Sequence, residues 1–225
     1  AITEGSPVRS RNGEQGSAVK RPRLAEIKSM MNMEKTSNIA GIDYSTTSPS
    51  ICVKVGDSWD IHFLTLKKKL ADEYWHQPFL FFGHSLPNIP ITISRYKYIS
   101  SWAMDVIKSY DVNAVILEDY AYAATGRVFN IGENTGILKY RLLHKDIPFY
   151  EVPPTVIKKY ATGKGNAKKE MMLSNFITTT GVNIHDVMNY AGDNPISDIV
   201  DSFFICEYAI NNPDEIDCPI IQGLL

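Results

Sequence analysis

The sequence predicts an α/β fold in which helices flank a mixed five-stranded sheet, with three antiparallel strands followed by two parallel ones. Three short runs rich in Ile, Val, Phe and Tyr come first, at residues 38–44, 50–56 and 59–66, and turn signals separate them. Two further apolar runs, at residues 112–122 and 147–152, then alternate with segments of helical period. Three consecutive strands followed by alternating helices and strands are typical of a mixed sheet with helices on its faces.

Local signals support the individual elements. Residues 45–49, STTSP, and the Gly-Asp-Ser sequence at 56–58 are turn signals between the first three strands. The run VNAVILEDYAY is nearly continuous in apolar residues, which favours a strand in the middle of the sheet. Segment 67–90 mixes Pro and Gly with large apolar residues, so we predict a long loop there that covers the core or a partner. Helices are predicted at residues 91–110, 130–145, 168–180 and 194–212.

The composition predicts one domain with an N-terminal extension. A chain of 225 residues, 44% of them hydrophobic, can bury one substantial core, which we assign to residues 37–225. Residues 1–36 are rich in Ser, Gly, Glu, Arg and Lys, and we predict that they are disordered. This segment is either a basic DNA-binding arm or an extension added for expression, and its basic cluster comprises Arg9, Arg11, Lys20, Arg21 and Arg23.

The sequence also limits the compartment and the class of partner. No apolar run approaches the about 18 to 20 residues that span a bilayer, and the N-terminus lacks the apolar core of a secretory signal. Three scattered cysteines, Cys52, Cys206 and Cys218, are too few for a disulfide framework or a zinc site. We therefore expect a soluble, intracellular protein, in a cytoplasm, a host-cell nucleoid or an organellar matrix. Because the net charge is −2, any binding to nucleic acid must depend on local basic patches.

Four carboxylates stand where they can converge. Asp43 ends the first predicted strand and Glu118 ends the central one. Asp198 and Asp201 lie three residues apart near the start of the last helix, so they share a face, and Asn194 and Pro195 are predicted as its N-cap and first residue. Hard divalent cations prefer oxygen ligands, and a two-metal site needs several carboxylates in a small volume. The pattern predicts such a site.

Each acid also has a simpler interpretation. Asp43 could cap a turn, Glu118 could be part of a solvated strand end, and the two aspartates could form the acidic first turn of a surface helix. The apolar residues around Asp201 weaken the last interpretation, because an unpaired charge among them would be costly.

The combination of GIDYSTTSPS, AVILEDYAY and SDIVDSFFICEYAI, in this order and spacing, resembles the RuvC family of Holliday-junction resolvases in the ribonuclease H-like superfamily. In its divergence the chain is most similar to phage, viral or organellar members, and the likeness spans about residues 38–211. The resemblance implies a ribonuclease H-like fold and a homodimer that cuts four-way junctions by paired phosphodiester hydrolysis, with other branched DNA as a further expected class of substrate. It also implies that Mg²⁺ or Mn²⁺, two per active site, is held by Asp43, Glu118, Asp198 and Asp201.

A basic segment supports the resemblance. PPTVIKKYATGKGNAKKEMM is similar to a family segment that carries basic residues near the scissile phosphate, and we expect Lys168 or Lys169 to be catalytic. Aromatic residues after the central strand could stack on unpaired bases, although such residues more often belong to the core. The predicted DNA-binding residues are Lys158, Lys159, Lys164, Lys168, Lys169, Tyr120, Tyr122 and Phe129. Segment 75–91 departs from the family in length and apolar character, so it could form the dimer interface or a covering lid.

Three alternatives remain open. A nuclease of the same superfamily that cuts RNA–DNA hybrid or RNA would carry the same acids. A catalytically silent scaffold that binds nucleic acid or a protein would need none of them. GIDYSTTS also resembles the first phosphate loop of sugar kinases and other actin-like ATPases, but that fold needs a second related domain and gives the paired helix acids no role.

Overall fold

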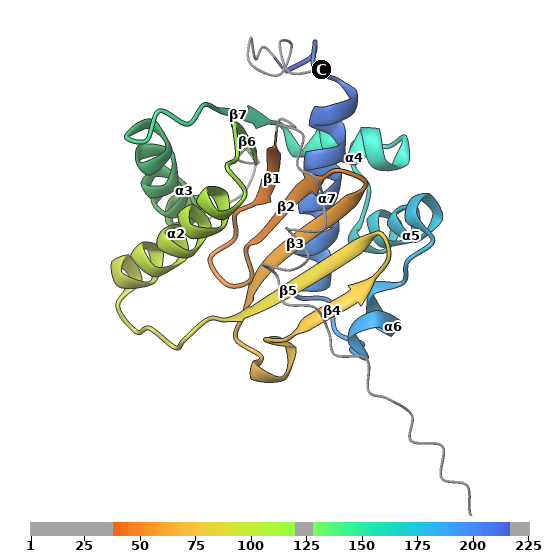
Figure 1. Cartoon of the computed structure of the whole chain (residues 1–225), viewed down its shortest axis with the longest axis horizontal. Helices are drawn as coiled ribbons and strands as arrows, with labels where there is room; N and C mark the ends of the chain where they lie inside the picture. The colour runs from red at the N-terminus through yellow and green to blue at the C-terminus, as the bar shows by residue number, and fades with distance from the viewer. Residues whose placement is uncertain (1–37, 120–127, 217–225) are drawn as a thin grey trace, which may run out of the picture. The chain divides into compact units, whose positions relative to one another are not determined.

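The structure is a computed structural model and describes residues 38–119 and 128–216. Its sheet has seven strands in the order β4-β5-β3-β2-β1-β6-β7 (Figure 1). β1 pairs antiparallel with β2 and β2 with β3, whereas β1–β6, β6–β7 and β3–β5 are parallel pairs. The predicted α/β class is thus confirmed. The strands are β1 (Ile39–Asp43), β2 (Ser50–Val55), β3 (Ser58–Thr65), β4 (Glu73–His76), β5 (Phe79–Ser85), β6 (Ala114–Glu118) and β7 (Phe149–Val152).

The predicted strand count of five was wrong, because segment 67–90 is not a long loop. It contains a short 3-10 helix, η1 (Lys68–Leu70), and the hairpin of β4 and β5, which pair antiparallel. β5 reads FLFFGHS and lies between β3 and β4, so its phenylalanines are buried. Pro and Gly suggested a loop, but Pro78 lies just before β5. Gly83 lies within β5, where the absence of a Cβ atom allows the backbone carbonyl of Leu70 to pack against the strand.

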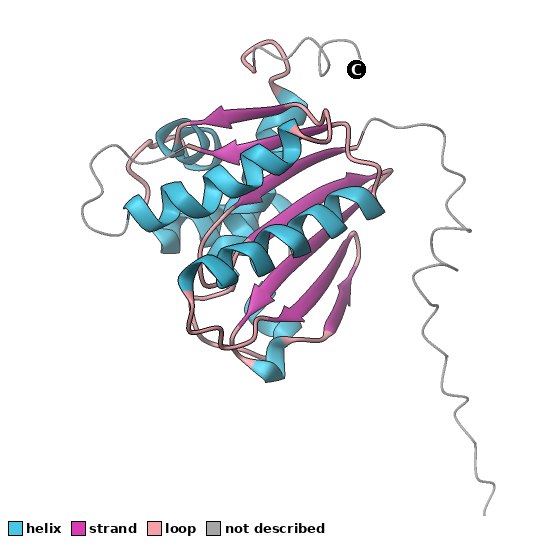
Figure 2. Cartoon of the chain, turned by 90° about the vertical axis from the view of Figure 1, so that its left-hand side faces the viewer, coloured by secondary structure: helices cyan, strands magenta, loops and turns pink. Residues whose placement is uncertain are grey.

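Helices cover both faces of the sheet. α2 (Thr92–Ser109) and α3 (Val128–Leu143) lie over one face, in front of the strands in Figure 2. α7 (Ile196–Asn211) crosses the other face, with three shorter helices beside it (Figure 1). These are α4 (Pro154–Thr162), α5 (Lys169–Thr180) and α6 (Ile184–Met188). None of the helices in the described ranges is long and apolar enough to cross a membrane.

Two of these helices were not predicted from sequence. α4 begins at Pro154, where the pair Pro153–Pro154 suggested only a turn, although proline suits the first residue of a helix. α6 has five residues, too few to show a helical period. The predicted division into segment 1–36 and one domain at 37–225 stays a prediction, and the N-terminal basic cluster and Cys218 lie outside the described residues.

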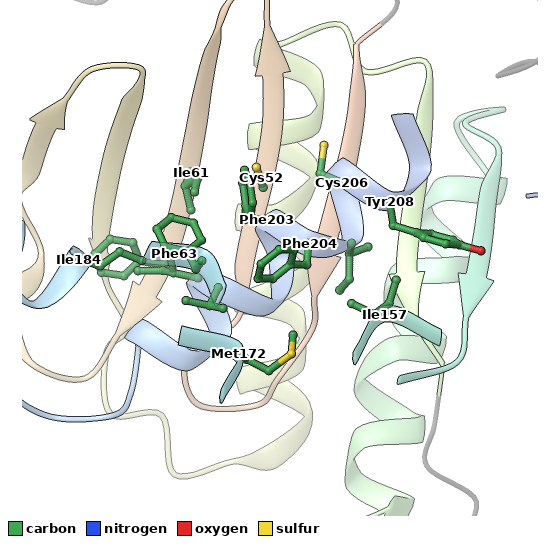
Figure 3. Packing of buried hydrophobic residues seen from close by; sticks show 14 of the residues in the cluster. Cys52, Ile61, Phe63, Ile157, Met172, Ile184, Phe203, Phe204, Cys206 and Tyr208 are labelled. Carbon is green, nitrogen blue, oxygen red and sulfur yellow. The ribbon is translucent and has the colours of Figure 1, made fainter. Parts of the chain in front are cut away.

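The core between the sheet and α7 is rich in aromatic side chains. Phe203 contacts Phe176 edge to face, with ring centroids 5.0 Å apart, and Phe79 at 5.6 Å. Figure 3 shows Phe203 and Phe204 of α7 between strand residues and Met172 of α5. Burial of such large apolar side chains on α7 fixes this helix firmly against the sheet.

α7 approaches the sheet most closely at Gly41. A Cβ atom at this position would lie 2.7 Å from both Cα and Cβ of Cys206, so only glycine allows the contact. The Cys206 thiol also donates to the Ile39 carbonyl at 3.5 Å. The close approach therefore sets the height of α7 over β1.

The start of α7 corrects one sequence-based prediction. The helix begins at Ile196, one residue later than predicted, and Pro195 occupies the N-cap position without a side-chain hydrogen bond. The Asn194 side-chain oxygen instead accepts from the Ser197 hydroxyl at 2.9 Å. Asp198 and Asp201 still fall in the first two turns.

We predict that Gly41→Ala destabilises the protein by about 1 to 3 kcal/mol, because the new methyl group overpacks the contact with Cys206. Urea unfolding measures the effect. The matched control is Gly136→Ala in α3, where a Cβ atom meets nothing within 4 Å and helix propensity favours alanine by up to about 1 kcal/mol. Equal stability changes for the two variants would contradict the close-packing argument.

Candidate active site

Two acidic residues end adjacent parallel strands. Ile42 of β1 lies opposite Leu117 of β6, and the next residue of each strand is Asp43 and Glu118 respectively. Neighbouring strands are about 4.8 Å apart, so both side chains belong to the same short stretch of the sheet edge. Parallel pairing of two short apolar strands is what brings these residues together.

The first turns of α7 are tied to the β1–β2 hairpin by side-chain hydrogen bonds. The Ser48 hydroxyl donates to Asp198 Oδ2, and the Ser50 and Ser202 hydroxyls lie 2.9 Å apart. Asp198, Ser202 and Cys206 are spaced by four residues, so they form one stripe of α7 that faces β1 and β2. This stripe carries the helix acids to the end of β1, where Asp43 pairs with Ser50.

The four carboxylates influence one another electrostatically. Burial and then the charges of Asp198, Glu118 and Asp201 hold the pKa of Asp43 well above its usual range. Proximity to the Asp198 carboxyl group thus adds to the effect of burial in raising the pKa of Asp43. Burial raises the pKa of Asp198 as well, although its hydrogen bond from Ser48 opposes the rise.

The other two acids show the same effect. Burial raises the pKa of Glu118 to about 6, against the opposing influence of Lys158. Burial, followed by the charges of Glu118 and Asp198, raises the pKa of Asp201 to about 7. The four groups therefore resist simultaneous ionisation near neutral pH unless a positive charge joins them.

This donor set fits a hard divalent cation. All four side chains offer carboxylate oxygens, the ligands that Mg²⁺ and Mn²⁺ prefer, and a cation would offset their mutual repulsion. Within residues 38–119 and 128–216, no three His, Cys, Asp or Glu side chains are already arranged so that they could hold a metal ion.

Two of the predicted lysines lie near the acids. Lys158 of α4 lowers the pKa of Glu118, and Lys169 of α5 lowers those of Asp198 and Asp201. The Lys169 ammonium also donates to the Ser197 hydroxyl at 3.1 Å. Lys169, Ser197 and Asp201 line one groove of about 400 Å³ between α5 and α7. Of the two lysines expected to be catalytic, Lys169 is thus the one beside the acids.

The remaining predicted DNA-binding residues are more peripheral. Lys168 is exposed at the N-cap of α5, and Lys159 and Lys164 are exposed on α4 and on the turn that follows it. Phe129, at the start of α3, is 80% exposed and therefore does not belong to the core. Tyr120 and Tyr122 lie outside the described residues.

Sequence reasoning missed the serines that position the acids. The STTS stretch was interpreted as a turn between strands or as part of a phosphate loop, and the Ser45 hydroxyl accepts from the Ser48 backbone N–H at 2.9 Å within this turn. That interpretation did not assign Ser48 to Asp198, because these residues are 150 positions apart. The available signal was Ser202, which follows Asp198 by four residues and so shares its helix face.

The chain is similar in sequence and in fold to known proteins. No protein-family model matches the chain. The crossover junction endodeoxyribonuclease RuvC of Chlamydia abortus is 31% identical over 110 residues, which cover 48% of this chain and 63% of that protein. The match thus spans less than two thirds of this relative's length. The Chlamydia muridarum protein of the same name is 28% identical over 136 residues, which cover 60% of this chain and 76% of that protein.

The fold comparison agrees with the sequence comparison. The structure of Thermus thermophilus RuvC superposes with a TM-score of 0.50 at 16% identity, covering 79% of this chain and 96% of that chain. A likeness at this identity concerns the fold alone, and the sheet described above accounts for it. The chain is thus similar in sequence to part of these RuvC proteins and shares the fold of the Thermus thermophilus RuvC structure.

Proposed function

We propose that this protein is a metal-dependent endonuclease that cuts four-way DNA junctions, and other branched DNA, by phosphodiester hydrolysis. The convergence of four acids from β1, β6 and α7 carries the proposal, because their raised pKa values indicate a shared site for positive charge. The relatives named crossover junction endodeoxyribonucleases support the choice of DNA.

Each side chain then has a distinct role. Asp43 is influenced by the charges of all three other acids, so it would be the central ligand of a bound cation, and Glu118, Asp198 and Asp201 would be the further ligands. Bound Mg²⁺ or Mn²⁺ would supply an activated water and charge neutralisation at the phosphate. Ser48 orients Asp198, and Lys169 holds a positive charge where negative charge develops on the phosphate.

The proposal includes a homodimer, because resolving a junction requires two cuts. Exposed apolar side chains on α2 and α3 support this assembly: Ile93 is 61%, Tyr140 68% and Leu143 70% exposed. Ile93 and Tyr140 line one hollow between the two helices. Such a surface is typical of an interface between protein molecules. An intracellular location, where the buried thiols Cys52 and Cys206 stay reduced, completes the proposal.

We predict that Asp43→Asn abolishes metal-dependent cutting, with a loss of about a hundredfold or more, because the variant loses the central cation ligand. The assay compares a labelled four-way junction, a flap, a duplex and an RNA–DNA hybrid, with Mg²⁺, with Mn²⁺ and with chelator. The matched control is Asp105→Asn on the exposed face of α2, which should cut at the wild-type rate.

Three outcomes of this assay would contradict the proposal. No metal-dependent cutting of any substrate would exclude an endonuclease, and full activity of Asp43→Asn would exclude the assigned site. Preferential cutting of the hybrid would identify the protein as a ribonuclease of the same superfamily.

We predict that the protein sediments as a dimer and that Ile93→Lys with Tyr140→Lys converts it to a monomer, because two buried charges would oppose association. The control is Trp75→Lys on β4, an equally exposed aromatic residue at 71%. A monomeric wild type, with and without junction DNA, would count against the dimer. Dissociation by Trp75→Lys alone would assign the interface to segment 75–91 instead.

We predict that the metal-free protein loses stability as the pH rises from about 5 to 8. An acid whose pKa is raised in the folded state binds more protons in the folded than in the unfolded protein. Its contribution to stability is therefore complete below the unfolded pKa. That contribution is lost as the pH rises past about 6 for Glu118 and about 7 for Asp201. Across this pH range, the melting temperature should fall less for Asp201→Asn than for the metal-free wild type. It should also fall less for the wild type with Mg²⁺. Parallel curves for wild type and Asp201→Asn would contradict the repulsion.

A further inference from the structure

Three consecutive lysines follow β3. Lys67, Lys68 and Lys69, which we name the β3–η1 lysine patch, are all exposed. Within residues 38–119 and 128–216, no ion pair joins any of these three lysines to a carboxylate. Asp72, the nearest acid along the chain, accepts from the Glu73 backbone N–H at 2.9 Å. The patch is therefore a concentrated, unneutralised positive charge.

The sheet topology places this patch at the edge that carries the acids. β1 and β3 each pair antiparallel with β2, so they run in the same direction and their carboxyl ends lie at the same edge. Phe63 of β3 is level with Asp43, because both pair with Ser50 of β2, and Thr65 ends β3 two residues further on. Two strand spacings amount to roughly 10 Å across the sheet, and two residues add roughly 7 Å along it.

Side-chain contacts hold the patch against the segment that precedes α7. The Lys67 ammonium donates to the Asn194 carbonyl at 3.0 Å and also to the Tyr190 hydroxyl. It lies 4.5 Å from the centre of the Tyr190 ring, and the Lys69 ammonium lies 5.2 Å from it. Asn194 lies two residues before the start of α7, and Asp198 lies in the first turn of that helix. Lys67 is thus anchored to the segment that leads into the turn carrying Asp198.

The patch lies on the opposite flank of the acids from Lys158 of α4. In the strand order, β3 lies on one side of β1, whereas β6 and β7 lie on the other, and α4 follows β7 directly. Lys158 of α4 therefore approaches the acids from the β7 side, and the patch from the β3 side. Positive charge on both flanks matches a DNA strand that crosses the acids.

We propose that the β3–η1 lysine patch binds backbone phosphates of the duplex arm next to the cleaved bond. A DNA strand carries one phosphate per about 3.4 Å of helix axis, so the roughly 12 Å between Asp43 and the end of β3 corresponds to about three to four phosphates. Contacts of this type set the position of the substrate without reading its bases. The inference rests on the proposed function, because it takes DNA as the substrate of the acids.

The test measures DNA binding separately from cutting. Fluorescence anisotropy with a labelled four-way junction uses Asp43→Asn protein in Mg²⁺, so that the DNA stays intact. Lys68→Gln with Lys69→Gln is combined with this background, and Lys67 is kept because its ammonium also ties Asn194. The matched control is Lys108→Gln with Lys145→Gln, two exposed lysines at the ends of α2 and α3, near the starts of β6 and β7 at the opposite edge.

The proposal predicts that the patch variant binds the junction up to about tenfold more weakly and that the slope of log affinity against log salt becomes shallower by about 0.9 per lysine removed. The control variant should match its parent in both. An unchanged slope in the patch variant, while the wild type cuts the junction, would overturn the patch and leave the proposed function standing. Absence of DNA binding by the parent would overturn both, and an effect seen only with RNA–DNA hybrid would overturn the DNA assignment.

Discussion

The close approach of α7 to β1 at Gly41 is the contact on which the candidate site depends. Because a side chain at this position would meet the backbone of Cys206, glycine allows the helix to lie directly on the strand. The aromatic residues of α7 then bury their rings against the sheet, and the stripe of Asp198 and Ser202 reaches the β1–β2 hairpin. The position of the helix acids is therefore a consequence of core packing several residues away.

This packing brings negative charges together at an energetic cost. Four carboxylates share a half-buried edge of the sheet, and their pKa values rise because burial and mutual repulsion both disfavour the charged form. The protein offsets part of this cost with the Ser48 hydroxyl and with the ammonium groups of Lys158 and Lys169. A divalent cation would offset the remainder, so the same repulsion that strains the metal-free site favours metal binding.

The sequence alone predicted much of this arrangement for a physical reason. The strands within residues 38–66 could be predicted because they follow from short-range periodicity and from turn residues, which are visible in one sequence. Locating these strands also located the acid at a strand end. Strand β5 was missed because Pro78 and Gly83 resemble loop residues, although one precedes the strand and the other admits a neighbouring carbonyl. The bond from Ser48 to Asp198 and the anchoring of Lys67 at Asn194 join distant segments, and only the folded chain reveals them.

Calorimetric titration of the metal-free protein with Mn²⁺ tests most directly whether the packing of α7 on β1 builds a cation site. The account predicts that Mn²⁺ binds the wild type near pH 6.5 with release of protons, because the raised pKa values leave some of the carboxyl groups protonated. Asp43→Asn should bind at least about tenfold more weakly. Equal Mn²⁺ affinity in the two proteins, or no binding to the wild type, would contradict the account.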